Sequence, residues 1–260
     1  MRRNLSWMYA SCGMILAVWP AHAASIPVCA GPTEIARARI VRVEQNGALI
    51  LSDGRALLLE GIRLPLAADK APRALVDQAR ATLLALARDG LVTGAAVPPK
   101  QDRYDRVRVQ GFTETMWLQQ ALLEQGLARV AIVSDREECA ADLYRFEAVA
   151  RAARRGIWAN AAYRVRGNRD DWRSDVGSFQ LIEGRVSRVV ERDGRLLLDF
   201  GTDGRSGLLA VVAGEDRRNF RRTDPVSLEG RTVRVRGVVQ DMGGRPQVSL
   251  SNPAQIEILP

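Results

Sequence analysis

The side chains that could carry chemistry in this chain of 260 residues are arginines and carboxylates. Its single histidine, His22, lies in a segment that we predict to be removed from the mature protein. Without it, the chain cannot use a Ser-His or Cys-His mechanism and has no imidazole metal ligand. Cys29 and Cys139 are the two cysteines outside that segment. Two cysteines are too few for a structural zinc site.

A charged turn is predicted at residues 102–106 (DRYDR), immediately before a strand predicted at 107–112 (VRVQGF). Asp105 suits such a turn because aspartate tolerates the left-handed backbone conformation better than most residues do. One interpretation of Arg106 is structural, since it could pair with Asp102 or Asp105 and hold the turn.

The elements that must position this turn are predicted to be strands joined by tight turns. Residues 39–51 (RIVRVEQNGALIL) predict two strands around an Asn-Gly pair, which is the strongest short hairpin signal when apolar runs flank it. Residues 57–66 (LLLEGIRLPL) predict a third strand, with a bend at Gly61 and an end at Pro65. The resulting meander brings residues 62–66 to one end of a barrel-like sheet.

Three helices are predicted from apolar residues that recur every three or four positions. Pro72 suits the first turn of the first helix, and Thr115 is a candidate N-cap for the second. The predicted helices span residues 71–88, 116–125 and 139–155, and a further strand spans 91–97.

Residues 57–66 resemble the core of the thermonuclease, or staphylococcal-nuclease-like, family. The usual family text at this place is Arg-Leu-x-Gly-Ile-Asp-x-Pro-Glu. The DRYDR turn resembles the family's Asp-[Lys/Arg]-Tyr-Gly-Arg, and Gly-Ile-Trp at 156–158 resembles the end of its last helix. The resemblance covers about residues 36–159 and implies an OB-fold barrel with three helices and calcium-dependent cleavage of phosphodiester bonds. This chain keeps the positions that shape the backbone, namely Leu59, Gly61, Ile62 and Pro65.

The same resemblance places other residue types at the positions that carry the family's chemistry. Its two metal-binding aspartates fall on Gly47 and Arg63. A hard cation such as calcium needs oxygen ligands, so we expect no metal and no other cofactor, although the family implies calcium. The remaining replaced positions are Leu58 for an arginine, Leu66 for a glutamate, and Ile132 and Ser134 for two tyrosines that stack on the nucleoside.

Three positions in the DRYDR turn match the family's binding residues. The resemblance implies that Arg106 contacts the scissile phosphate, which makes it the one catalytic candidate, and that Arg103 and Tyr104 lie beside the nucleotide. The leading hypothesis is therefore a non-catalytic module for nucleic acid or another polyanion, in which Arg63 and Arg106 hold an anion where the metal and phosphate lie in the family.

Two alternatives come from other functional classes. One is a divergent metal-dependent nuclease that uses carboxylates elsewhere, such as Asp53, Glu60 or Asp105. The other is an envelope protein whose barrels serve only as an interaction scaffold. The formal charge of +8 does not decide among these hypotheses, because an arginine-rich composition also fits a GC-rich genome.

Residues 1–23 predict a secretory signal peptide, with a retained anchor as the alternative. Arg2 and Arg3 form the positive start, an apolar run follows, and Ala-His-Ala ends it as a small-x-small cleavage site. The run is too short for a membrane span, which needs about 20 apolar residues. Cleavage would lower the formal charge from +8 to +6 by removing Arg2 and Arg3. It predicts a periplasmic or secreted protein without a transmembrane segment.

An oxidising compartment would allow Cys29 and Cys139 to form a disulfide, with two buried thiols as the alternative. The bridge would tie the start of the mature chain to the start of the third helix. It would close a loop of roughly 110 residues, which contributes about 4–5 kcal/mol in the chain-entropy model.

The predicted fold class is mainly β with helices, in two domains. The thermonuclease-like domain spans 24–159, an arginine-rich linker with alternating charges spans 160–177, and a small OB-like β domain spans 178–260. The mixed charges of the linker favour a solvated surface. The hairpins RIVRVEQNGALILSDG and RVSRVVERDGRLLLDFG echo each other and suggest two barrels of one pattern.

Two groups of arginines stand out in the second domain. In the strand predicted at 232–239, Arg234 and Arg236 alternate with valines, as expected for a strand with one apolar face. The densest basic cluster is flanked by acidic residues, which favours a solvated surface over a nucleic-acid patch. It consists of Arg217, Arg218, Arg221 and Arg222.

Overall fold

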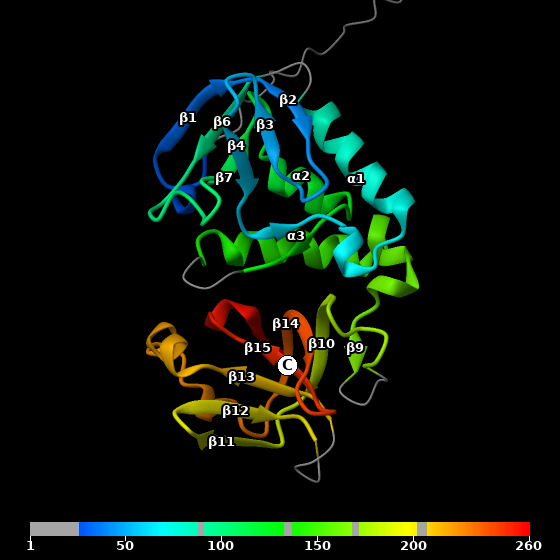
Figure 1. Ribbon diagram of the computed structural model, residues 1–260, viewed down its shortest axis with the longest axis vertical. Helices are drawn as coiled ribbons and strands as arrows, with labels where there is room; N and C mark the ends of the chain where they lie inside the picture. The colour runs from blue at the N-terminus through cyan, green and yellow to red at the C-terminus, as the bar shows by residue number, and fades with distance from the viewer. Residues whose placement is uncertain (1–25, 88–90, 133–136, 168–171, 202–206) are drawn as a thin grey trace, which may run out of the picture.

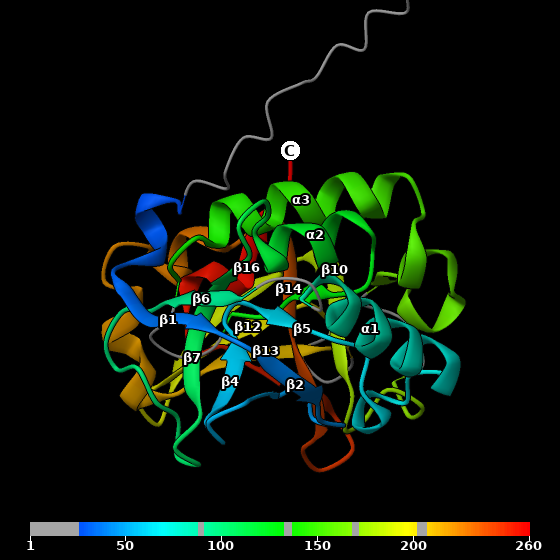
Figure 2. The ribbon, with the colours of Figure 1, turned by 90° about the horizontal axis from the view of Figure 1, so that it is seen from above.

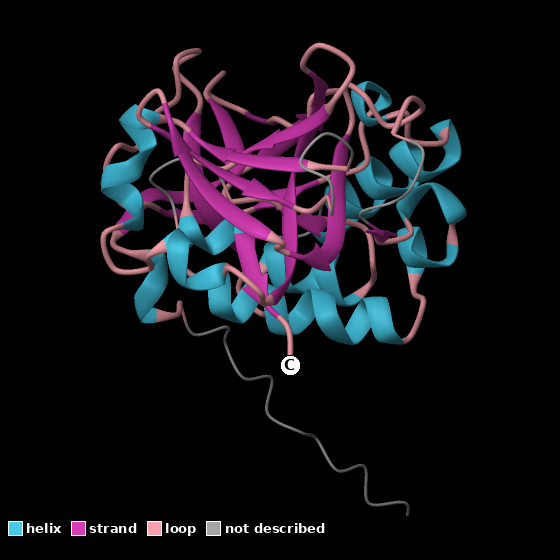
Figure 3. Cartoon of the chain, turned by 90° about the horizontal axis from the view of Figure 1, so that it is seen from below, coloured by secondary structure: helices cyan, strands magenta, loops and turns pink. Residues whose placement is uncertain are grey.

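Two β-rich units are stacked one above the other in the computed structural model (Figure 1). The N-terminal unit runs from β1 to α3, and the C-terminal unit runs from β9 to β16. Helices lie around the outside of the strands (Figure 3). None of the helices in the described part of the chain is long and apolar enough to cross a membrane. The structure describes residues 26–87, 91–132, 137–167, 172–201 and 207–260, so the predicted signal peptide at 1–23 lies outside the described residues.

The N-terminal unit contains a six-stranded sheet with the pairing order β1-β6-β7-β4-β3-β2. Neighbours are antiparallel except β4 and β7, which are parallel. β1 and β2 stand at the two ends of this pairing order, although only Arg39 separates them along the chain. The strands are β1 (Thr33–Ala38), β2 (Ile40–Val43), β3 (Leu49–Leu51), β4 (Ala56–Leu59), β6 (Val92–Ala95) and β7 (Val107–Phe112).

The predicted turns of this sheet are confirmed by their backbone geometry. Gly47, between β2 and β3, has a φ of 85°, and Asn46 Oδ1 accepts a hydrogen bond from Ala48 N at 2.9 Å. Gly61 follows β4 with a φ of 80°, in the left-handed region where glycine is favoured. A Cβ at Gly61 would also lie 2.5 Å from Leu143 Cδ1, so both the bend and the packing require glycine.

The three predicted helices are present but shorter than predicted. The second begins at Leu118 rather than after Thr115, because Met116 N donates to Thr113 Oγ1 and residues 113–116 form a turn. The third begins after Cys139, whose φ of 60° is incompatible with a right-handed helix. Figure 2 shows α2 and α3 side by side. The helices are α1 (Arg73–Leu86), α2 (Leu118–Glu124) and α3 (Ala140–Ala152).

Cys29 and Cys139 form the predicted disulfide, with their Cα atoms 5.1 Å apart. Cys29 lies in a 3-10 turn at Val28–Ala30, and Cys139 is the residue before α3. The bridge therefore attaches the start of the described chain to the helix that faces the C-terminal unit. Cys139 is buried in the core of the N-terminal unit, and Cys29 packs against that core.

The C-terminal unit has a second sheet whose strand order repeats that of the first. Its pairing order is β11-β12-β13-β15-β14-β10-β9, and β16 pairs with β14. Two residues separate β10 from β11, and β13 is parallel to β15 as β4 is to β7. The strands are β9 (Arg166–Gly167), β10 (Phe179–Arg185), β11 (Arg188–Arg192), β12 (Arg195–Asp199), β13 (Leu209–Val212), β14 (Thr232–Asp241), β15 (Pro246–Ser249) and β16 (Ile256–Ile258).

The two hairpins that echo each other in sequence occupy equivalent places in the two sheets. The first forms β2 and β3, and the second forms β11 and β12. Each hairpin follows a strand that pairs outside the hairpin. In the N-terminal unit β1 pairs with β6, and in the C-terminal unit β10 pairs with β14. The shared text therefore corresponds to a shared topology.

Part of the segment predicted as a solvated linker is buried instead. Arg166 belongs to β9, which pairs in parallel with β10, and its guanidinium donates two hydrogen bonds of 2.8 Å to Asp175. Trp172 packs in the core of the C-terminal unit. The opposite charges at 166 and 175 therefore satisfy each other inside the protein, whereas alternating signs had indicated solvent exposure.

Candidate functional site

A hollow of about 780 Å³ lies at one end of the N-terminal sheet. Its walls come from the β2–β3 turn, from the stretch that leaves β4, and from the 102–106 turn that precedes β7. The stretch that leaves β4 forms a short strand, β5 (Ile62–Arg63), which pairs with β8 (Arg129–Val130). All four residues predicted to bind an anion line this hollow, namely Arg63, Arg103, Tyr104 and Arg106.

The 102–106 turn is organised by Asp102. Its Oδ1 accepts hydrogen bonds from Tyr104 N at 2.9 Å and from Arg106 N at 3.1 Å. Its Oδ2 accepts from Arg106 Nε at 2.8 Å and Nη2 at 2.6 Å. Asp105 adopts a φ of 59°, the left-handed conformation predicted for it. Arg106 therefore makes the ion pair with Asp102 that its structural interpretation predicted, and this pair holds the turn.

These contacts change the acidity of Asp102. Burial raises the pKa of its carboxyl, but hydrogen bonds from the Arg106 side chain and from two backbone N–H groups outweigh that effect. The net result is a pKa below the ordinary value of 3.8. Asp102 is therefore ionised at neutral pH and serves as an acceptor rather than a proton donor.

Tyr104 projects from this turn with 61% of its surface exposed. The Arg103 guanidinium carbon lies 4.9 Å from the centre of its ring, and that of Arg106 lies 5.0 Å away. Both distances are within the range of cation–π contact. The turn thus presents an exposed aromatic ring flanked by two cations at the edge of the hollow.

Arg63 and Arg106 are held in separate ion pairs. Arg63 Nε lies 2.5 Å and Nη2 2.9 Å from the two carboxylate oxygens of Asp69. Asp69 Oδ2 also accepts from Arg129 Nη2 at 3.2 Å, and the Arg63 guanidinium lies 5.7 Å from the ring of Phe179. The guanidinium of Arg63 is therefore directed toward the contact between the two units, which argues against a joint anion site with Arg106.

A second buried ion pair in the hollow escaped sequence analysis. Arg108 Nε lies 2.5 Å from Glu60 Oε2, and both side chains are largely buried. A usable signal existed, because Arg108 lies between Val107 and Val109 in β7 and must point to the face opposite these buried valines. Of the carboxylates considered for a divergent nuclease, Glu60 lines the hollow, while Asp53 and Asp105 are outside its lining among the described residues.

The residues at the family's metal-binding positions do not fit a calcium ion. Gly47 offers no side chain, and Arg63 offers a cation that is already paired with Asp69. The carboxylates that do line the hollow, Glu60 and Asp102, are each bound to an arginine. In the part of the chain that the structure describes, no group of three or more His, Cys, Asp or Glu side chains is arranged to hold a metal ion.

The two positions where the family has stacking tyrosines give no platform of that kind. Ile132 is buried in the core of the N-terminal unit. Ser134 lies outside the described residues. Among the described residues that line the hollow, the exposed aromatic ring is that of Tyr104.

Comparison with known proteins agrees with the fold of the N-terminal unit. Residues 59–160 match the family described as Staphylococcal nuclease homologue, so this part of the chain is a staphylococcal-nuclease-like domain. The match begins at the last residue of β4 and includes the 102–106 turn and all three helices. No curated protein matches the chain. The fold of this domain is one that supports nuclease activity or nucleic-acid binding.

Proposed function

We propose that this protein binds single-stranded nucleic acid through Tyr104 and its flanking arginines, without calcium-dependent cleavage. The observation that carries the proposal is the exposed Tyr104 ring beside Arg103 and Arg106 at the edge of the hollow. Unpaired bases stack on such rings, and each stacked base contributes about 1–3 kcal/mol in proteins that bind single strands. The neighbouring guanidiniums supply phosphate contacts.

The arginines retain donors for this role. Arg106 uses Nε and Nη2 on Asp102, and within the described residues no hydrogen bond engages its Nη1. Arg103 is exposed, and the described part of the chain holds no ion-pair partner for it. A phosphate next to Tyr104 could therefore be contacted without breaking the ion pair that shapes the turn.

The donor set supports the proposed loss of the catalytic metal. Calcium takes about six to eight oxygen ligands, with carboxylates prominent among them. Freeing Glu60 or Asp102 for this purpose would leave Arg108 or Arg106 without its carboxylate in a partly buried setting, which is costly. We infer that the hollow binds an anion rather than a metal.

The proposed place of action is the periplasm or the exterior of the cell. The signal predicted at 1–23 motivates this proposal, and the disulfide between Cys29 and Cys139 supports it, because such bonds persist in oxidising compartments. A polyanion met there would include extracellular nucleic acid.

The proposal is tested by fluorescence anisotropy of labelled single-stranded DNA titrated with the mature protein at several salt concentrations. Tyr104→Ala should weaken binding by roughly 5- to 150-fold, the equivalent of about 1–3 kcal/mol. Arg103→Ala should reduce the slope of log affinity against log salt by about 0.7–1. Arg73→Ala, which removes an exposed arginine of α1 outside the hollow, is the matched control and should change neither.

Two outcomes would redirect the interpretation. Absence of binding at low salt would overturn the proposal and favour the interaction-scaffold hypothesis instead. Cleavage of DNA in the presence of calcium, magnesium or manganese, abolished by Arg106→Ala, would show a nuclease that uses other carboxylates, and Glu60 would then be the first to test because it lines the hollow.

A further inference from the structure

One wall of the hollow is joined directly to the C-terminal unit. β5 supplies Ile62 and Arg63 to the lining and pairs with β8, where Ile62 faces Val130 and Arg63 faces Arg129. Ala131, which follows β8 and also lines the hollow, donates its N–H to Gly61 O at 2.9 Å. The position of β8 therefore decides the position of this wall.

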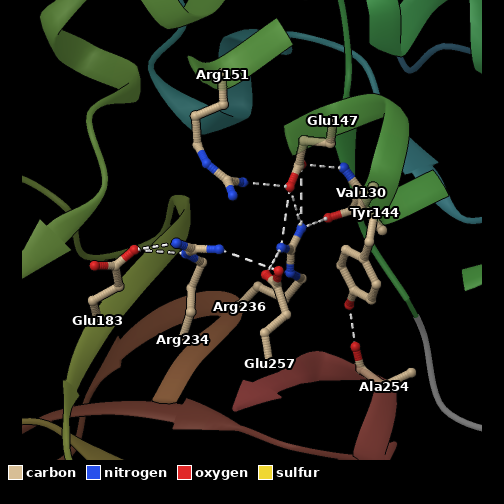
Figure 4. Close-up of polar contacts among 9 residues, drawn as sticks. All are labelled: Val130, Tyr144, Glu147, Arg151, Glu183, Arg234, Arg236, Ala254 and Glu257. Carbon is tan, nitrogen blue, oxygen red and sulfur yellow. Dashed lines mark hydrogen bonds and ion pairs between the residues drawn. The ribbon is translucent and has the colours of Figure 1, made fainter. Parts of the chain in front are cut away.

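The backbone of Val130 is held by a charged pair that spans the two units (Figure 4). Val130 N donates to Glu147 Oε1 at 2.7 Å, and Val130 O accepts from Arg236 Nη1 at 2.9 Å. Glu147 belongs to α3, whereas Arg236 belongs to β14 of the C-terminal unit. The two side chains are 0% exposed, and Arg236 Nη1 lies 3.1–3.2 Å from both Glu147 oxygens.

The other residue of β8 makes a reciprocal contact with the C-terminal unit. Arg129 Nη1 donates to Phe179 O at 2.6 Å, and Phe179 N donates to Asp69 Oδ1 at 3.2 Å. Both backbone groups of Phe179, the first residue of β10, are thus bound by the N-terminal unit. Burial lowers the pKa of Arg129 to about 10, so this side chain remains charged at neutral pH.

The charged pair is poorly explained by stability alone. Replacing a buried ion pair with packed apolar residues is often neutral or stabilising, because removing charges from water is costly. Nε of Arg236 is buried without a partner in the described part of the chain, which adds a further cost. What apolar residues could not supply is the pair of directed hydrogen bonds to Val130 N and O.

We propose that Arg236 and Glu147 are positioning residues for the hollow. By holding both backbone groups of Val130, they fix β8, and through β8 they fix the β5 wall that faces the ligand space. Affinity for single-stranded nucleic acid at Tyr104 therefore depends on a contact made by the C-terminal unit. This inference rests on the proposed function, and it assigns the C-terminal unit a role in that function.

The variant pair Arg236→Met with Glu147→Gln tests this role. It removes the two facing charges together, so neither is left buried opposite a missing partner, and the amide oxygen of the introduced glutamine can still accept from Val130 N. Arg151, whose side chain is 19% exposed, loses its 3.0 Å contact with Glu147 in this variant. Glu257, the other partner of Arg236, keeps its 3.1 Å contact with Arg234 Nη1. Arg234→Met is the matched control, because Arg234 lies on the same strand two residues earlier and bonds only to Glu183 and Glu257 among the described residues (Figure 4).

Amide hydrogen exchange and DNA affinity are then measured on both proteins, with Tyr104→Ala as a reference. The double variant should exchange faster in peptides covering 60–64 and 128–132 and should bind DNA about fivefold or more weakly, the lower end of typical coupling between sites. Arg234→Met should change neither. Unchanged exchange and affinity in the double variant would overturn the inference, provided that Tyr104→Ala weakens binding. If Tyr104→Ala has no effect, the proposed function fails, while the exchange result still tests the wall.

A measurement on the unaltered protein covers the case in which the double variant does not fold. Coupling of binding free energies is reciprocal, so DNA binding must stabilise the contact that supports it. Adding single-stranded DNA should slow exchange in the 60–64 and 128–132 peptides and also around Phe179 and Arg236. Protection confined to the 102–106 turn would contradict the inference.

Discussion

The disulfide between Cys29 and Cys139 allows a quantitative prediction of stability. The two cysteines are separated by 110 residues, so the bridge closes nearly the whole N-terminal unit into one loop. In the chain-entropy model a loop of this size restricts the unfolded chain by about 4–5 kcal/mol at 25 °C. We therefore expect Cys29→Ser with Cys139→Ser to lower the free energy of unfolding by about this amount.

The same figure converts to a shift in melting temperature. For proteins of roughly 150–250 residues, about 1 kcal/mol corresponds to about 2–4 °C. The expected fall in Tm is therefore about 8–20 °C. Directed bonds across the two units, including those of Arg236 and Phe179, predict that both units melt in one transition, so the whole protein should show the shift.

Differential scanning calorimetry of the mature protein, with and without a reductant, is the appropriate measurement. Reduction of the wild type should reproduce the Tm of the double serine variant, and the reductant should leave that variant unchanged. Cys29→Ser alone should match the double variant, because either change removes the bridge. A fall of less than about 3 °C would refute the loop-closure reasoning, since it corresponds to about 1 kcal/mol.

Two further predictions concern the hollow. Millimolar calcium should leave the Tm of the mature protein unchanged, because Gly47 and Arg63 occupy the metal-binding positions; a rise of several degrees would reveal a retained site by mass action. Asp102 has a depressed pKa in the folded state, so its contribution to stability is present above its ordinary pKa of 3.8 and is lost as pH falls through the lower folded value. Urea unfolding of wild type and Asp102→Asn should therefore differ at neutral pH and converge in strong acid, and a gap that stays constant would show that ionised Asp102 is not responsible.

Features governed by local sequence were predictable. The turns at Gly47 and Gly61 follow from residues that tolerate a positive φ, and the left-handed Asp105 follows from the same rule. The helices follow from apolar spacing, although their ends moved by one to three residues where side chains such as Thr113 captured backbone groups. Placement of Arg63, Arg103, Tyr104 and Arg106 around one hollow followed from the family resemblance.

Features governed by distant partners were not predictable. Val233 and Val235 of β14 are buried, as the alternating pattern of the strand predicted. Arg236 is also 0% exposed, although the same pattern placed it on the polar face. Its partner Glu147 is 89 residues away on a helix of the other unit. Arg63 was expected to meet an anion with Arg106, whereas it pairs with Asp69 near the contact between the units. A charge pattern cannot reveal which opposite charge the fold will place beside it.

Residue types alone predicted the staphylococcal-nuclease-like scaffold, allowed a bridge between Cys29 and Cys139, and fixed the absence of carboxylates at two metal positions, because residue type sets backbone preference, thiol chemistry and ligand chemistry. Which arginines are free for a ligand, and which are committed inside the protein, became clear only from the folded chain. The physical reason is that burying a charge is costly unless its partner is in place, and that partner is supplied by the packing of the two units.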